Sequence, residues 1–193
     1  MKTKFLILIP FIFIACKEID IEKVVKEDNL SGEKKDYLIA CEKYDNARSC
    51  NAIAAAYSRG EGAVENEDKA LLYYEKACNL AIKLNPDEIQ KIQSEIGFWP
   101  CSSAAGMYRA KVKKGFKDDS EYKALELHKK DCLNGFDDYR SCLNVAKYYE
   151  KRQKYSQARE YYLRSCLKSE VCLGFGVCDV CRGGSNYLEM LYK

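Results

Sequence analysis

The stretch CNAIAAAYSRGEGAVENEDKALLYYEKACNL, residues 50–80, decides the fold. Its second half places apolar residues three and four positions apart, from Ala70 to Ala77, which predicts an amphipathic helix. Its first half is rich in alanine and predicts a second helix, and Gly60 and Gly62 lie between the two. A phosphate-binding loop would follow a strand, and none precedes these glycines. We therefore interpret Gly-x-Gly as a turn, where glycine supplies a positive φ.

The same helix pair returns twice along the chain. KALLYYEKAC (69–78) aligns with KALELHKKDC (123–132) and with QAREYYLRSC (157–166), which places three alanines in one column and three cysteines in another. Each aligned segment follows another helical segment that begins on a cysteine. The preceding segments are residues 50–57, 101–108 and 142–149. One helix pair cannot bury its apolar face alone, so a repeat of about 34 to 40 residues indicates stacked pairs. We expect an all-α chain, a short α-solenoid of antiparallel helix pairs.

The N-terminus has the pattern of a secretory leader. Lys2 and Lys4 precede an unbroken apolar run over residues 5–14, and a small residue follows it. A membrane anchor or a buried strand is the alternative, but a membrane-spanning helix needs about 20 apolar residues and this run is shorter. We expect residues 1–15 to be a signal peptide.

The stretch FIAC (13–16) resembles the bacterial lipoprotein box. The resemblance implies that Cys16 becomes the lipidated N-terminus, and Lys17 in place of aspartate implies sorting to the outer membrane. Residues 17–35 are strongly charged and contain no aromatic residue, so we expect residues 16–35 to form a lipidated N-terminus and tether. A single domain over residues 36–193 follows, and we expect it in the periplasm, anchored to the bacterial outer membrane by this lipid.

Net charge limits the classes of partner, and the cysteine content indicates the cellular compartment. Without Lys2 and Lys4, the chain has 30 basic residues against 29 acidic ones, a net charge of about +1. Nucleic-acid binding favours a basic patch or stripe, and Lys and Glu alternate here, so we expect no nucleic-acid partner. Eleven cysteines minus Cys16 leave ten, an even number that favours disulfides in an oxidising compartment. Spacing alone does not give their connectivity.

The first repeat resembles the Sel-one-like repeat (SLR), a relative of the tetratricopeptide repeat, and its cysteines resemble the cysteine-rich secreted branch of that family. The matching residues of this unit are Ala55, Tyr57, Gly60, Gly62, Val64, Asp68, Lys69, Ala70, Tyr74 and Ala77. The resemblance runs from residue 37 to the C-terminus. It implies a disulfide between the end of one unit and the start of the next.

The resemblance therefore implies the pairs Cys41–Cys50, Cys78–Cys101 and Cys132–Cys142. For the last four cysteines, alignment of the helices favours Cys166–Cys181 and Cys172–Cys178. Two other interpretations stay open for these four: a redox pair at Cys178-x-x-Cys181 and a Cys₄ zinc site. We expect structural disulfides, no metal and no cofactor.

His128 is the only histidine, and it aligns with Tyr74 and Tyr162 in the second-helix column. We interpret it as a packing residue, because no adjacent nucleophile or orienting acid is identifiable in the sequence. We expect no enzyme. Some proteins of the cysteine-rich SLR branch have been described as binding penicillin, so the resemblance keeps an alternative: a β-lactam- or peptidoglycan-binding or weak β-lactamase-like protein. The serine-lysine signature of serine β-lactamases is absent.

A departure from the repeat lies at residues 82–100. This insertion predicts an extra helix after the start signal Asn85-Pro86 and ends in Phe98-Trp99-Pro100. Trp99, the only tryptophan, either caps the joint between units or contacts a partner, since tryptophan is enriched at binding hot spots. The candidate partner-binding residues are Phe98, Trp99 and Tyr108.

Solenoids present extended concave surfaces for binding. Small SLR lipoproteins resemble immunity proteins that neutralise a toxic secreted effector, often a lipase of type VI secretion systems. We therefore expect a lipid-anchored periplasmic protein-binding module, monomeric when unbound, with a toxic effector enzyme as its protein partner and the membrane contacted through the lipid alone.

Overall fold

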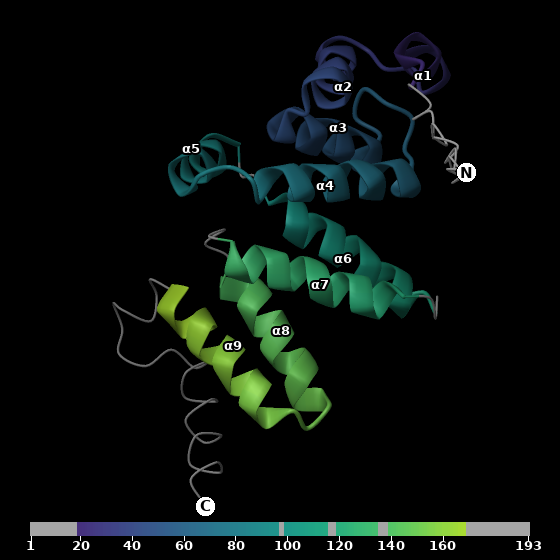
Figure 1. The fold of residues 1–193 in the computed structure, drawn as a ribbon. Helices are drawn as coiled ribbons and strands as arrows, with labels where there is room; N and C mark the ends of the chain where they lie inside the picture. The colour runs from purple at the N-terminus through teal and green to yellow at the C-terminus, as the bar shows by residue number, and fades with distance from the viewer. Residues whose placement is uncertain (1–18, 97–98, 116–118, 135–138, 169–193) are drawn as a thin grey trace, which may run out of the picture.

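The structure, a computed structural model, describes residues 19–96, 99–115, 119–134 and 139–168. These residues form nine α-helices and no strand, which confirms the all-α class (Figure 1). The helices are α1 (Ile21–Glu27), α2 (Glu33–Tyr44), α3 (Ala47–Arg59), α4 (Glu67–Ala81), α5 (Pro86–Ile96), α6 (Pro100–Lys113), α7 (Ser120–Leu133), α8 (Tyr139–Lys151) and α9 (Tyr155–Lys168).

The helices pack as consecutive pairs. The most extensive contacts join α3 to α4, α6 to α7 and α8 to α9, which are the three repeats that the sequence predicts. Contacts between α2 and α3, α4 and α6, and α7 and α8 connect each pair to its neighbour. In Figure 1 the pairs follow one another from α1–α4 at one end of the molecule to α8–α9 at the other, and α5 lies to one side.

The turn inside the first pair is the one expected from Gly-x-Gly. Gly60 ends α3 at φ +69°, and Gly62 has φ +73°. These left-handed conformations suit glycine, because a Cβ atom is strained there. Asn66 then caps the N-terminus of α4, and its side chain accepts a hydrogen bond from the backbone N–H of Lys69.

Small residues let the helices approach closely. Ala54, Ala105 and Ala146 each lie four positions after the first cysteine of their unit, and all three are fully buried. Tyrosines fill the wider gaps, as where the rings of Tyr57 and Tyr73 stack with centroids 5.8 Å apart. Alanine, cysteine and tyrosine columns of the repeat therefore contribute to the core together with buried leucine, isoleucine and valine side chains.

Three disulfides join neighbouring units: Cys41–Cys50 between α2 and α3, Cys78–Cys101 between α4 and α6, and Cys132–Cys142 between α7 and α8. These are the pairs that the SLR resemblance implies. Cys166 in α9 is also disulfide-bonded. The other cysteines of the expected C-terminal pairs, Cys172, Cys178 and Cys181, lie outside the described residues, and so does Cys16.

The expectation that residues 16–35 are a tether is wrong from Ile21 onward. This segment forms α1 and the start of α2, and Leu30 is buried in the core. Asp28, only 8 % exposed, accepts hydrogen bonds from the Tyr57 hydroxyl and the Lys69 ammonium. The charged composition predicts a solvated chain, but the carboxylate of Asp28 finds its partners in the first helix pair. The folded part of the chain therefore begins before residue 36.

The inserted helix is present as α5. Asn85 and Glu88 cap its first turn reciprocally, since each side chain accepts a hydrogen bond from the other residue's backbone N–H. Ile89 is buried and attaches α5 to the core. The disulfide between Cys78 and Cys101 closes the chain segment that contains this helix.

Candidate interaction surface

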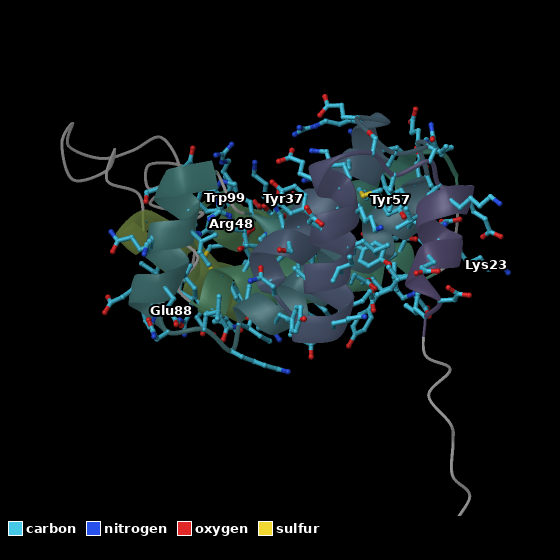
Figure 2. The ribbon with its side chains drawn as sticks, turned by 90° about the horizontal axis from the view of Figure 1, so that it is seen from above. Lys23, Tyr37, Arg48, Tyr57, Glu88 and Trp99 are labelled. Carbon is cyan, nitrogen blue, oxygen red and sulfur yellow. A yellow bond between two sulfur atoms is a disulfide. The ribbon has the colours of Figure 1, made fainter. Side chains whose placement is uncertain are left out.

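Two grooves lie along the first helices of the pairs. The α3 groove has a volume of about 310 Å³ and lies between α2, α3 and α4, with Tyr37, Arg48, Ala52 and Arg59 among its lining residues. Tyr37 and Arg48 are labelled in Figure 2. The α8 groove has a volume of about 240 Å³ and lies between α6, α7 and α8, with Arg109, Leu125, Lys147 and Lys151 among its lining residues.

The same columns of the repeat line both grooves. They lie two, five, six and nine positions after the first cysteine of the unit. In α3 these positions hold Ala52, Ala55, Ala56 and Arg59, and in α8 they hold Asn144, Lys147, Tyr148 and Lys151. In α6 they hold Ser103, Gly106, Met107 and Ala110, of which Ser103 also lines the α3 groove. The repeat alignment could have found this face, had the alignment been extended to these four columns.

Cations line the α3 groove, and two of them have acidic neighbours. The ammonium of Lys34 lies 2.7 Å from Glu33, and the guanidinium of Arg59 lies 3.6 Å from Glu61. At least one partner of each pair is solvent-exposed, so the pairs are weak, but they offset part of the positive charge at this end of the face.

The α8 groove is also lined by three cations and one acidic residue. Arg109, Lys147 and Lys151 are all exposed at its edge. Within the described part of the chain, no ion pair involves any of the three. The acidic residue of this groove, Glu121, is already paired with Arg152 at 3.0 Å. The α8 groove is therefore an electropositive site whose three cations have no ion-pair partner among the described residues.

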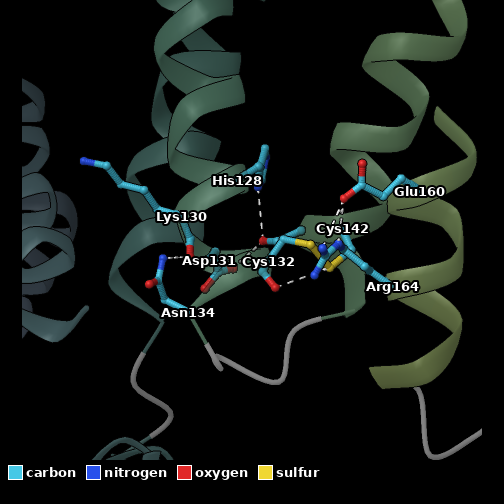
Figure 3. The surroundings of a disulfide bond; sticks show 9 residues. His128, Lys130, Asp131, Cys132, Asn134, Cys142, Glu160 and Arg164 are labelled. Atoms are coloured by element: carbon cyan, nitrogen blue, oxygen red, sulfur yellow. Dashed lines mark hydrogen bonds and ion pairs between the residues drawn. A yellow bond between two sulfur atoms is a disulfide. The ribbon is translucent and has the colours of Figure 1, made fainter. Parts of the chain in front are cut away.

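His128 forms the floor of the α8 groove and belongs to a buried chain of hydrogen bonds beside the Cys132–Cys142 disulfide (Figure 3). Its Nδ1 lies 3.2 Å from the Ser141 hydroxyl, which donates to the Asp131 carboxylate. Its Nε2 lies 3.3 Å from the Asn144 amide nitrogen, a donor. This network assigns the proton of a neutral imidazole to Nδ1. Burial, and secondarily the Arg109 charge, lower the pKa of His128 to about 4, in agreement with a neutral ring.

A hydrolytic triad uses the residue types of Ser141, His128 and Asp131, but the hydrogen bonds here connect them in a different order. In a triad the acid orients the histidine and the histidine accepts the serine proton. Here Asp131 binds the serine instead, His128 donates to Ser141, and Ser141 is fully buried. The sequence interpretation missed this group because its members come from two helices. The arrangement satisfies buried polar atoms and fixes the α7–α8 packing.

The predicted partner-binding residues are not brought together at one exposed site. Trp99 is half-buried at the start of α6, where its carbonyl accepts a hydrogen bond from the backbone N–H of Ser103 (Figure 2). Tyr108 is only 6 % exposed, and its hydroxyl donates to Glu75 at 2.7 Å. It is therefore a packing residue between α6 and α4 and presents little surface to a partner. Phe98 lies outside the described residues.

Further features of the described residues bear on membrane and metal sites. None of the described helices combines the length and apolar character needed to cross a bilayer. Over the same residues, no group of three or more His, Cys, Asp or Glu side chains is arranged to hold a metal ion. Comparison of the chain with family models, curated proteins and solved structures finds no match.

Proposed function

We propose that this chain is a lipid-anchored periplasmic protein-binding module with an SLR-like α-solenoid fold. Its most specific proposed role is that of an immunity protein, which binds and neutralises a toxic secreted effector such as a type VI secretion lipase. The consecutive helix pairs and the disulfides between them support the solenoid. Disulfides also favour an oxidising compartment such as the periplasm.

The observation that carries the proposal is the recurrence of one set of helix columns in both grooves. Because α3 and α8 use the same columns, their groove-lining residues face the same way relative to each helix pair. Repeat proteins bind partners on extended surfaces that successive units build in this manner. In α6, Gly106 lies in these columns, and a Cβ atom built on it meets no heavy atom within 4 Å. The middle of the face is therefore open to a partner.

The hydrogen-bond order around His128 favours binding over the alternative of a β-lactam or cell-wall enzyme. A serine nucleophile must expose its oxygen to substrate and transfer its proton to a base. The Ser141 hydroxyl is buried and points its proton at Asp131. This supports a protein that acts by occupying a surface of its partner.

The proposal predicts that a neighbouring gene encodes a toxin, and co-expression and inhibition assays with that toxin test it. The purified protein should abolish the toxin's activity at a near equimolar ratio, and the complex should bury at least about 1,000 Å². A Gly106→Trp variant, which blocks the open middle of the face, should fold normally and lose protection. Leu72→Trp, at an exposed position on α4, is the matched control and should protect fully.

Two results would contradict the proposal. One is hydrolysis of a β-lactam or of a cell-wall fragment that a single substitution such as Ser141→Ala abolishes, since that requires an enzyme. The other is equal protection by the Gly106→Trp and wild-type proteins, since that would remove the face from the interface.

A further inference from the structure

The α8 groove holds its positive charges in an arrangement that the isolated chain does not relieve. Lys147 and Lys151 lie one turn apart on the same side of α8, where like charges repel. Arg109 adds a third positive charge from α6. Glu121, the carboxylate in the groove, already forms an ion pair with Arg152. An anionic group from outside the chain would relieve this repulsion.

A hydrogen-bond network that starts in the core and reaches the surface holds one of these cations in place. The Arg109 guanidinium donates to the Asn144 side-chain oxygen at 3.3 Å, and the Asn144 amide nitrogen faces Nε2 of His128 at 3.3 Å. His128 is in turn hydrogen-bonded to Ser141. Buried side chains between α7 and α8 therefore determine the orientation of Asn144. Arg109 is therefore positioned at the groove by a chain of hydrogen bonds that begins in the core.

The rest of the groove suits a protein segment. Ala124 and Leu125 give it a buried apolar wall, and the half-buried ring of Tyr148 gives it an amphipathic one. Nucleic acid is recognised along basic stripes, whereas here Glu121 lies among the lining residues and the chain is nearly neutral. Apolar walls beneath a small cluster of cations match a peptide segment that carries both carboxylate and apolar side chains.

We infer that the α8 groove binds an acidic segment of the partner protein, with Arg109, Lys147 and Lys151 pairing with its carboxylates. This inference rests on the proposed function, since it names the chemistry of the partner surface that the module recognises. The planar guanidinium of Arg109 suits bidentate pairing with a carboxylate. The two lysines supply charge that steers an acidic surface toward the groove. The α3 groove is the weaker candidate, because acidic neighbours already offset two of its cations.

Fluorescence anisotropy with a short fluorescein-labelled peptide of Glu and Leu tests the inference on the purified full-length protein. The peptide should bind, its affinity should fall steeply with added salt, and the peptide with Gln in place of Glu should not bind. The double variant Lys147→Glu/Lys151→Glu should weaken binding by about tenfold or more, and amide resonances of residues around Tyr148 should shift in the wild type.

Lys43→Glu/Lys91→Glu is the matched control. It makes the same change in net charge at two exposed lysines that line neither groove, and it should change the affinity by less than about twofold. Equal weakening in both double variants would overturn the inference, since net charge alone would then explain binding. Preferential binding of a labelled oligothymidylate at the same groove would overturn it in favour of nucleic acid.

The protection assay separates this inference from the proposed function. Protection by a wild-type protein that does not bind the acidic peptide would reject the groove assignment and leave the binding-module proposal standing. Peptide binding at the groove without inhibition of the toxin would reject the immunity role and leave the groove assignment standing.

Discussion

Asp28 ties the N-terminal segment to the first helix pair. Its carboxylate accepts from the Tyr57 hydroxyl and from the Lys69 ammonium, each at 2.5 Å, and its carbonyl accepts from the backbone N–H of Val64. Burial, followed by the bond to Asp28, raises the pKa of Tyr57 well above its usual range, so Tyr57 is a neutral donor. Tyr57 and Lys69, which carry the family resemblance, therefore also hold this segment.

Asp28→Ala should lower the free energy of unfolding by about 2 kcal/mol or more, because it leaves a buried tyrosine hydroxyl without its acceptor and a half-buried lysine without its counter-ion. Urea denaturation followed by circular dichroism measures this loss. Asp20→Ala removes a carboxylate that caps α1 at an exposed position and should cost about 1 kcal/mol or less. Equal losses in the two variants would show that Asp28 acts as no more than a local cap.

His128 should make stability depend on pH. Its pKa is about 6.5 in the unfolded chain and about 4 in the folded protein, because burial disfavours the imidazolium. Between these values the unfolded state binds the additional proton, so stability rises with pH across this window. The contribution of His128 to the free energy of unfolding, about 3 kcal/mol, is fully present above pH 6.5 and is lost progressively as the pH falls toward 4.

Denaturation curves of wild type and His128→Gln at a series of pH values check this expectation. Because His128 is the only histidine, the free energy of unfolding of the variant should change less with pH in this window, whatever its absolute stability. An unchanged slope in the variant would assign the pH dependence to carboxylates instead.

At the scale of the helix, α6 contains a glycine that its packing does not require. Gly106 lies in the helix interior, and a Cβ atom there meets no heavy atom within 4 Å. Gly106→Ala should therefore raise the free energy of unfolding by about 0.5 to 1 kcal/mol, because alanine loses less backbone entropy.

Gly62→Ala is the matched control, and it should change the free energy of unfolding in the opposite direction. Gly62 has φ +73°, and a Cβ atom there would lie 3.0 Å from Cγ of Lys34, so stability should fall. Thermal unfolding of both variants makes the comparison. Destabilisation by Gly106→Ala would indicate a contact at α6 that the structure does not describe.

The disulfides act at the joints between elements. Cys78–Cys101 spans 23 residues and Cys41–Cys50 spans 9, so the first restricts the unfolded chain more. Replacing the first pair by alanines should lower the free energy of unfolding by about 3 kcal/mol, and replacing the second should cost about 1 kcal/mol less. Denaturant titration of the two double variants checks both the size and the order. The reverse order would mean that local packing around the sulfurs outweighs chain entropy.

For the whole molecule, the proposed anchor and the folded domain should be separable. Cys16 precedes the first described residue, and α1 begins at Ile21, so Cys16→Ser should leave the helical circular dichroism spectrum unchanged. The variant should lose a metabolic fatty-acid label and move from the membrane fraction to the periplasm, because lasting attachment depends on its acyl chains. An unlabelled wild-type protein would reject the lipoprotein proposal.

Much of this architecture follows from the sequence alone. The helix pairs were predictable because apolar spacing, the glycine turn and the cysteine columns are local patterns that recur along the chain. The inserted helix after Asn85 follows from the same kind of signal, a capping residue followed by Pro86. The SLR resemblance adds the three cysteine pairs, since a disulfide at a joint links residues close in sequence.

Only the tertiary structure decided which polar side chains meet across helices. Asp28 and Lys69 are 41 residues apart, and the contact of His128 with Ser141 depends on how α7 packs against α8. For the same reason a charged segment proved to be part of the fold, and Tyr108 proved to be buried. Periodicity tells which face of a helix is apolar, but the partner of a buried carboxylate or imidazole depends on helix rotation and crossing, and these are set by the packing of the whole chain.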